Sequence, residues 1–164
     1  MSGAVAPPPD AELEPQSVAA RSGSNFLAGF VCLDAERRDA MTAIYAFCRV
    51  VDDAVDDAPD GEVAGARLGF WRDELSAAHA GSPRTPIGAA LHRAMGRFGV
   101  PAAPLEDLIA GCAMDLDPVG IADEEQLRLY CRRVASAVGH ACLFVFGATS
   151  AGSGRYADAL GQAL

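Results

Sequence analysis

Residues 49–57 read RVVDDAVDD, an arginine followed by four aspartates within six positions. The apolar residues before and among them recur at helical spacing, and a proline and a glycine end the pattern. The aspartates therefore crowd the C-terminal end of the predicted helix, where the helix dipole is already negative. The like-charge pairs Asp52–Asp56 and Asp53–Asp57 each cost roughly 0.2–0.5 kcal/mol. A bound cation would offset this repulsion.

At about 100° per residue, four polar side chains fall within roughly 60° of one another on this helix: Tyr45, Arg49, Asp52 and Asp56. The other two aspartates of the cluster turn away on the opposite flank. Two carboxylates one turn apart can share Mg²⁺, which takes oxygen ligands, keeps several waters and bridges to phosphates. Arg49 could donate to the same phosphate oxygens. The pattern thus leaves two interpretations open, a magnesium site and a solvated acidic helix end.

Two smaller features also carry polar chemistry. Asp115 lies one heptad after Leu108, so we expect it to face inward on an otherwise apolar helix side. An inward carboxylate needs a partner, which leaves open a salt bridge to an arginine or a place in a polar cavity. Arg21, Ser22 and Ser24 form a hydroxyl-rich segment suited to phosphate oxygens, although SGS is equally typical of a loop.

The composition excludes several classes of protein. The chain has 164 residues and is 51% hydrophobic, which suits one globular core and excludes a disordered protein. A net charge of −9, with no long basic cluster, argues against a nucleic-acid partner. The five cysteines show no metal-binding spacing, and we expect free thiols in a reducing cytoplasm.

The periodicity predicts an all-α protein without repeats or an internal linker. Residues 1–16 read as a disordered lead-in without signal-peptide features, and 17–164 as the N-terminal portion of one helical domain. Asp34 should cap the helix that carries the aspartates, and Asp123 with Gln126 resembles a capping box. The uncharged stretch 134–154 approaches the length of a membrane span, but its glycines and polar residues favour a buried helix. The other helices are expected over 17–31, weakened at 22–25, and over 63–80, 86–98 and 105–116.

Four sequence blocks, in this order and spacing, resemble the squalene/phytoene synthase family, the head-to-head trans-isoprenyl diphosphate synthases. They are SGSNF at 22–26, ERRDAMTAIYAFCRVVDDAVDD at 36–57, DLIAGCAMDL at 107–116 and LYCRRVASAVGHACLFVFG at 129–147. The resemblance covers about residues 17 to 164 and matches the N-terminal part of the family. The first and last blocks look nearest to bacterial squalene-type (presqualene diphosphate) enzymes, with bacterial phytoene synthases very close.

The resemblance implies a class I isoprenoid (terpenoid) synthase fold, with antiparallel helices around a central cavity. It implies Mg²⁺-dependent condensation of two prenyl diphosphates, either farnesyl diphosphate to presqualene diphosphate and squalene or geranylgeranyl diphosphate to phytoene, in hopanoid or carotenoid biosynthesis. A prenyl substrate or product would also bring the chain to the inner face of the membrane as a peripheral protein.

The resemblance also assigns roles to individual residues. Asp52 and Asp56 would bind the metal, and Tyr45 and Arg49 would act at the diphosphate. Ser22, Ser24, Arg49 and Asp115 would bind the substrate.

The sequence departs from the family pattern in one respect. Family members carry a second aspartate-rich motif on a facing helix, and no aspartate follows Asp158 in this sequence. We therefore expect that this chain alone does not hold a metal cluster from two sides. A fragment, a split gene product with a complementing C-terminal chain, and an inactive member acting as a binding or assembly protein all remain open.

Overall fold

The computed structural model describes residues 7–164, and every regular element in that range is helical. The α-helices are α1 (Pro15–Arg21), α2 (Phe26–Phe30), α3 (Ala35–Asp56), α4 (Gly61–His79), α5 (Pro86–Phe98), α6 (Ala103–Cys112), α7 (Glu124–Cys131), α8 (Ala137–Phe146) and α9 (Ala151–Ala163). A 3₁₀ turn, Ala113–Leu116, extends α6, and a π-helical turn, Arg132–Ser136, joins α7 to α8. The predicted all-α fold class is confirmed.

The predicted starts of α3, α5 and α7 are confirmed at atomic detail. Asp34 caps α3 by accepting a hydrogen bond from the backbone of Arg37 at 2.9 Å, and Asp123 caps α7 through the backbone of Gln126 at 2.8 Å. The Gln126 side chain accepts from the residue before the cap, at 3.0 Å, rather than from the cap itself. Pro86 stands in the first turn of α5, where a missing N–H costs nothing.

The first predicted helix is interrupted where the sequence suggested. α1 ends at Arg21, Gly23 adopts a left-handed φ of 62°, and α2 begins four residues after Ser22. The lead-in differs from the expectation, because α1 already begins at Pro15, and Asp10 accepts a hydrogen bond from Arg21 at 2.8 Å. The expected disorder of residues 1–6 concerns a segment outside the described residues.

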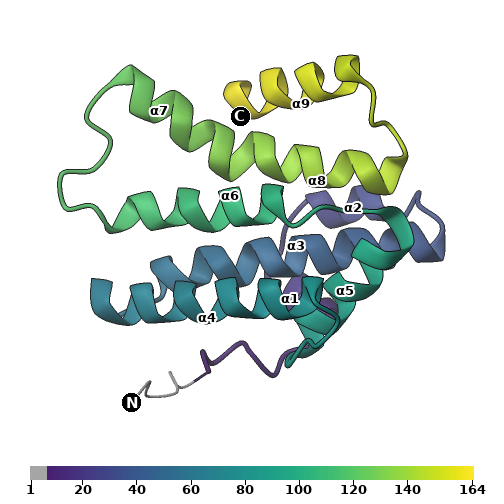
Figure 1. Cartoon of the computed structure of the whole chain (residues 1–164), viewed down its shortest axis with the longest axis horizontal. Helices are drawn as coiled ribbons and strands as arrows, with labels where there is room; N and C mark the ends of the chain where they lie inside the picture. Colours follow the sequence, from purple (N-terminus) through teal and green to yellow (C-terminus); the bar gives the residue numbers. More distant parts are fainter. Residues whose placement is uncertain (1–6) are drawn as a thin grey trace.

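α3 is the central helix of the molecule. It packs against α1, α4, α5, α6 and α8, and α4, α3 and α6 lie in roughly parallel rows, with α8 packed on both α3 and α6 (Figure 1). Its interior residues Ile44, Phe47 and Val51 are at most 1% exposed, and the Phe47 ring meets the buried Trp71 of α4 edge to face. Because α3 is held on several sides, its C-terminal aspartates have a fixed place in the fold.

The segment from Asp123 to Gly147 is one continuous but irregular helical rod. Its π-helical turn faces α6 at Gly111, where an added Cβ would lie 2.7 Å from Val134. Gly147 then ends α8 in the left-handed conformation, with a φ of 70°. Within residues 7–164, no helix is both long and apolar enough to cross a membrane.

Candidate metal and diphosphate site

The C-terminal turns of α3 place Asp52 and Asp56 one turn apart, beside Arg49. Oδ2 of Asp52 accepts a hydrogen bond from Nη1 of Arg49 at 3.2 Å, and half of the Asp52 side chain remains exposed to solvent. Burial raises the pKa of Asp52, the neighbouring Asp56 raises it further, and Arg49 opposes both effects. A second positive charge at this point would therefore stabilise the ionised pair.

Asp115 lies near these two carboxylates but differs from the prediction. It sits in the 3₁₀ turn after α6, is exposed, and accepts a hydrogen bond from the Tyr130 hydroxyl at 3.1 Å. The predicted inward orientation was wrong, because the α-helix tightens before this residue and shifts its direction from the apolar stripe. In the described structure its partner is a tyrosine, and no arginine pairs with it.

The electrostatics connect Asp115 with the α3 aspartates. Burial raises the pKa of Asp115, the Tyr130 hydroxyl lowers it, and Asp56 raises it. Burial and Asp115 together raise the pKa of Tyr130 to about 12, so this phenol remains a donor at neutral pH. Asp52, Asp56 and Asp115 thus share one region of negative potential between the ends of α3 and α6.

The donor set of this region fits a hard divalent cation with open coordination positions. Among residues 7–164, no group of three or more carboxylate, histidine or cysteine side chains is arranged to hold a metal by itself. Mg²⁺ is usually held by one or two carboxylates together with waters and substrate phosphates. Asp52 and Asp56 therefore fit the metal as a partial ligand set.

Ser22 and Tyr45 meet on the same side of α3, about two turns before Asp52. The Tyr45 hydroxyl donates to Oγ of Ser22 at 2.8 Å, and Ser22 in turn donates to the carbonyl of Ala19 at 2.7 Å. The backbone N–H of Ser24 also donates to this Oγ, at 3.3 Å. The predicted hydroxyl-rich segment is thus tied to α3 through one saturated serine hydroxyl.

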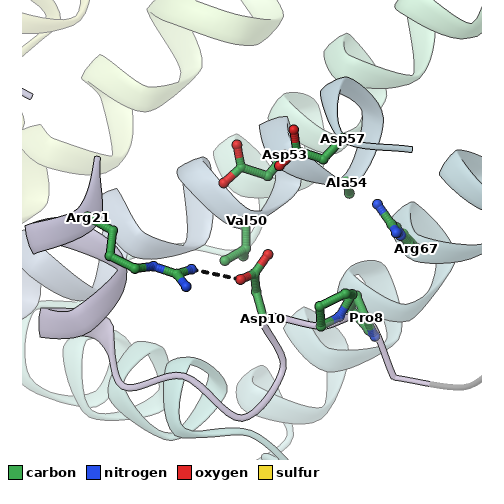
Figure 2. A pocket seen from close by; sticks show the side chains of 9 residues that line it. Pro8, Asp10, Arg21, Val50, Asp53, Ala54, Asp57 and Arg67 are labelled. Carbon is green, nitrogen blue, oxygen red and sulfur yellow. Dashed lines mark hydrogen bonds and ion pairs between the residues drawn. The ribbon is translucent and has the colours of Figure 1, made fainter. Parts of the chain in front are cut away.

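Asp53 and Asp57 turn to the opposite flank of α3, as the helical wheel predicts. There they line a cavity of about 370 Å³ together with Asp10, Arg21 and Arg67 (Figure 2). This cavity is separate from the Asp52–Asp56 side.

The sequence did not reveal that Arg49 also reaches this second flank. Its Nε donates to Oδ2 of Asp53 at 3.1 Å. Spacings of three and four residues both bring side chains together on a helix, so the contact could have been anticipated.

All five cysteines are free, as expected. Cys48, Cys112 and Cys142 lie on α3, α6 and α8, and burial is the main cause that raises the pKa of each thiol. The pKa of Cys112 rises to about 12 and that of Cys142 to about 11. These residues act as small apolar groups in the helix contacts.

The helical architecture and the acidic end of α3 together define a protein with an isoprenoid-synthase fold. Two solved structures share this fold. Squalene synthase HpnC from Alicyclobacillus acidocaldarius aligns with a TM-score of 0.79 and 32% identity, over 92% of this chain and 57% of that one. A dehydrosqualene synthase aligns with a TM-score of 0.71 and 27% identity, over 80% and 45% of the two chains.

The sequence comparisons give the family. Residues 19–164 match the squalene/phytoene synthase family model, and the chain belongs to this family. It is 37% identical to a phytoene synthase of Mycobacterium tuberculosis over 91% of this chain and 49% of the relative. It is 38% identical to a presqualene diphosphate synthase of Rhodopseudomonas palustris over 87% and 51%. The chain therefore spans about half the length of the curated relatives it matches.

Proposed function

We propose that this chain forms the first metal-binding half of a site for head-to-head condensation of two prenyl diphosphates. The observation that carries the proposal is the pair Asp52 and Asp56 on a helix fixed by packing, with Arg49 beside them and Asp115 nearby. Membership in the squalene/phytoene synthase family supports the same chemistry.

Mg²⁺ is the proposed cofactor, and Asp52 and Asp56 are its proposed protein ligands. When bound, the ion supplies Lewis-acid stabilisation of the charge that develops on a departing diphosphate. The chain's own contribution is a fixed, half-exposed carboxylate pair whose repulsion a cation relieves. Asp115 adds negative potential to the same region, and we assign it a supporting role in substrate binding.

The diphosphate itself is proposed to lie against Arg49, Tyr45 and the segment that carries Ser22 and Ser24. Arg49 supplies a permanent positive charge and several N–H donors for phosphate oxygens. The Tyr45–Ser22 hydrogen bond fixes the α1–α2 turn against α3, so the hydroxyls of this segment start from a defined position. Apolar residues of α3, α6 and α8 next to this region would exclude water from a reactive allylic cation.

The relatives are a phytoene synthase and a presqualene diphosphate synthase, and the proposal covers the substrates of both reactions. Farnesyl diphosphate would give presqualene diphosphate or squalene, and geranylgeranyl diphosphate would give phytoene. A prenyl chain is lipophilic, so we also propose contact with the surface of a membrane during substrate or product exchange. A complementing C-terminal chain is a further proposed partner.

A non-catalytic role is the second candidate. The observation that favours it is the incomplete ligand set, because no three potential ligands converge within residues 7–164. In this case the chain would bind a prenyl diphosphate or assemble with another protein without turning the substrate over.

Incubation of the purified chain with farnesyl or geranylgeranyl diphosphate and Mg²⁺ tests the proposal, with release of inorganic diphosphate and a C30 or C40 product as readouts. The Asp52→Asn variant is the control for background hydrolysis. Magnesium-dependent product that this variant lacks would support catalysis, and binding without product would favour the second candidate. If the chain shows neither substrate binding nor product, both candidate functions are contradicted.

A further inference from the structure

Arg49 contacts two aspartates that lie on different flanks of α3. Toward Asp53 it offers one edge of the guanidinium, with Nε 3.1 Å from Oδ2 and Nη2 2.5 Å from Oδ1. Toward Asp52 it offers a single nitrogen, Nη1, at 3.2 Å. The two-point contact fixes the plane of the guanidinium, whereas a one-point contact leaves it free to turn.

The two aspartates also differ in their exposure to water. The Asp53 side chain is 14% exposed, and that of Asp52 is 50% exposed. An ion pair sheltered from water is screened less by solvent and salt than an exposed one. The Arg49–Asp53 contact should therefore persist when the Arg49–Asp52 contact is broken.

Asp53 depends on this arginine in turn. Its Oδ1 is buried and, within the described residues, accepts no hydrogen bond. Nη2 of Arg49 lies 2.5 Å from it as an ion pair, but its geometry is not that of a hydrogen bond. A buried carboxylate oxygen without a donor is costly unless a cation lies close to it. Arg49 is that cation, which gives the pair a preferred arrangement.

We propose that Asp53 is a positioning residue that holds the Nε edge of Arg49. Asp52 then stays available to a metal, and the remaining N–H groups of Arg49 stay available to a diphosphate. The inference rests on the proposed function and deepens it. A metal held by Asp52 would compete with Arg49 for this carboxylate, and Asp53 would give the arginine a second anchor in that case.

The Asp53→Asn variant weakens this anchor, because it removes the negative charge and one of the two acceptor oxygens that face Arg49. Asp52 would then be the only carboxylate in contact with Arg49, and the arginine would compete with the cation for it. The variant should fold, because it also relieves the like-charge pair between Asp53 and Asp57 at the negative end of the helix. Asp57→Asn is the matched control, since it removes the same charge from the same cavity without a hydrogen bond or salt bridge to Arg49.

The test is a double-mutant cycle read by calorimetric titration of inorganic diphosphate in the presence of Mg²⁺. Wild type should bind, Asp53→Asn should bind about fivefold more weakly, and Asp57→Asn should stay within about twofold of wild type. Arg49→Gln should weaken binding about tenfold, and adding Asp53→Asn to it should cause no further loss, since the anchored group is gone.

Each outcome of the cycle decides the matter. Equal losses from Asp53→Asn with and without Arg49 would overturn the inference, because the effect would then be general electrostatics or misfolding. Tighter binding by Asp53→Asn would also overturn it, since Asp53 would then be a competitor for the arginine. Absence of diphosphate binding in wild type would overturn the proposed function as well, which distinguishes that failure from a failure of the inference.

Discussion

Replacing Glu74 should loosen the corner between α4 and α5, two helices that both pack against α3. The Glu74 side chain is fully buried, and its carboxylate accepts four hydrogen bonds from the loop that follows α4. Oε1 accepts from the backbone N–H groups of Arg84 and Thr85, both at 2.8 Å, and from the Thr85 hydroxyl at 3.0 Å. Oε2 accepts from Nε of Arg84 at 3.0 Å.

The structure ranks two substitutions at this position. Glu74→Ala leaves two backbone N–H groups without acceptors and removes the ion pair, so we expect a loss of about 3–5 kcal/mol in the free energy of unfolding. This corresponds to a fall in Tm of roughly 10 °C for a chain of this size. Glu74→Gln keeps an oxygen for three donors and places an amide opposite Arg84, whose side chain is 55% exposed and can turn to water. Its cost should be about 1–2 kcal/mol.

Gly88 supplies an independent check of the same contact. A Cβ at this position would lie 2.0 Å from Oε1 of Glu74, so Gly88→Ala must displace the carboxylate. In the Glu74→Ala background this clash is absent, and Gly88→Ala should cost much less there than in wild type.

Urea unfolding followed by circular dichroism measures all of these variants. Asp73→Asn is the control, because Asp73 is exposed on the same helix and its change should stay within about 0.5 kcal/mol. If the free energies of unfolding of Glu74→Ala and Glu74→Gln both lie within about 0.5 kcal/mol of wild type, the proposed role of the Glu74 hydrogen bonds is refuted. Additive costs of Glu74→Ala and Gly88→Ala would do the same.

Three further predictions concern other contacts. Gly161→Ala should weaken the packing of α9, because its Cβ would lie 2.4 Å from the backbone nitrogen of Ser136. Hydrogen exchange in α9 should then be faster than in wild type, and unchanged exchange would contradict this packing. Iodoacetamide should label the exposed Cys32 well before Cys112, whose pKa of about 12 leaves little thiolate at pH 8. Mass spectrometry of digests gives the order of labelling, and early labelling of Cys112 would be inconsistent with its burial. Tyr45→Phe removes the hydrogen bond to the α1–α2 turn and should lower stability by about 1 kcal/mol in urea unfolding, whereas a stabilised variant would argue against that bond.

The helical architecture could be predicted because its signals are local. Asp34, Asp123 and Pro86 mark helix starts through chemistry that acts within one turn, and all three occur in the structure where the sequence places them. The helical period also predicts the flank of α3 on which each aspartate lies, and Asp53 and Asp57 indeed turn toward the second flank.

The partners of individual side chains could not be predicted to the same degree. Asp115 was expected to face inward, but a 3₁₀ turn changes its direction and Tyr130 becomes its partner. The distance between these residues along the chain leaves no local signal for the contact. The π-helical turn at Arg132–Ser136 was likewise missed, since the close approach of α6 at Gly111 is a tertiary feature.

We propose that Asp52 and Asp56 bind Mg²⁺ and thereby allow the chain to hold a diphosphate. Calorimetric titration of farnesyl diphosphate into wild type, Asp52→Asn and Asp56→Asn, each with and without Mg²⁺, tests it most directly. We expect binding by wild type that requires Mg²⁺, and a loss of about tenfold or more in each variant. Binding that is independent of Mg²⁺, or unchanged in both variants, would contradict the claim.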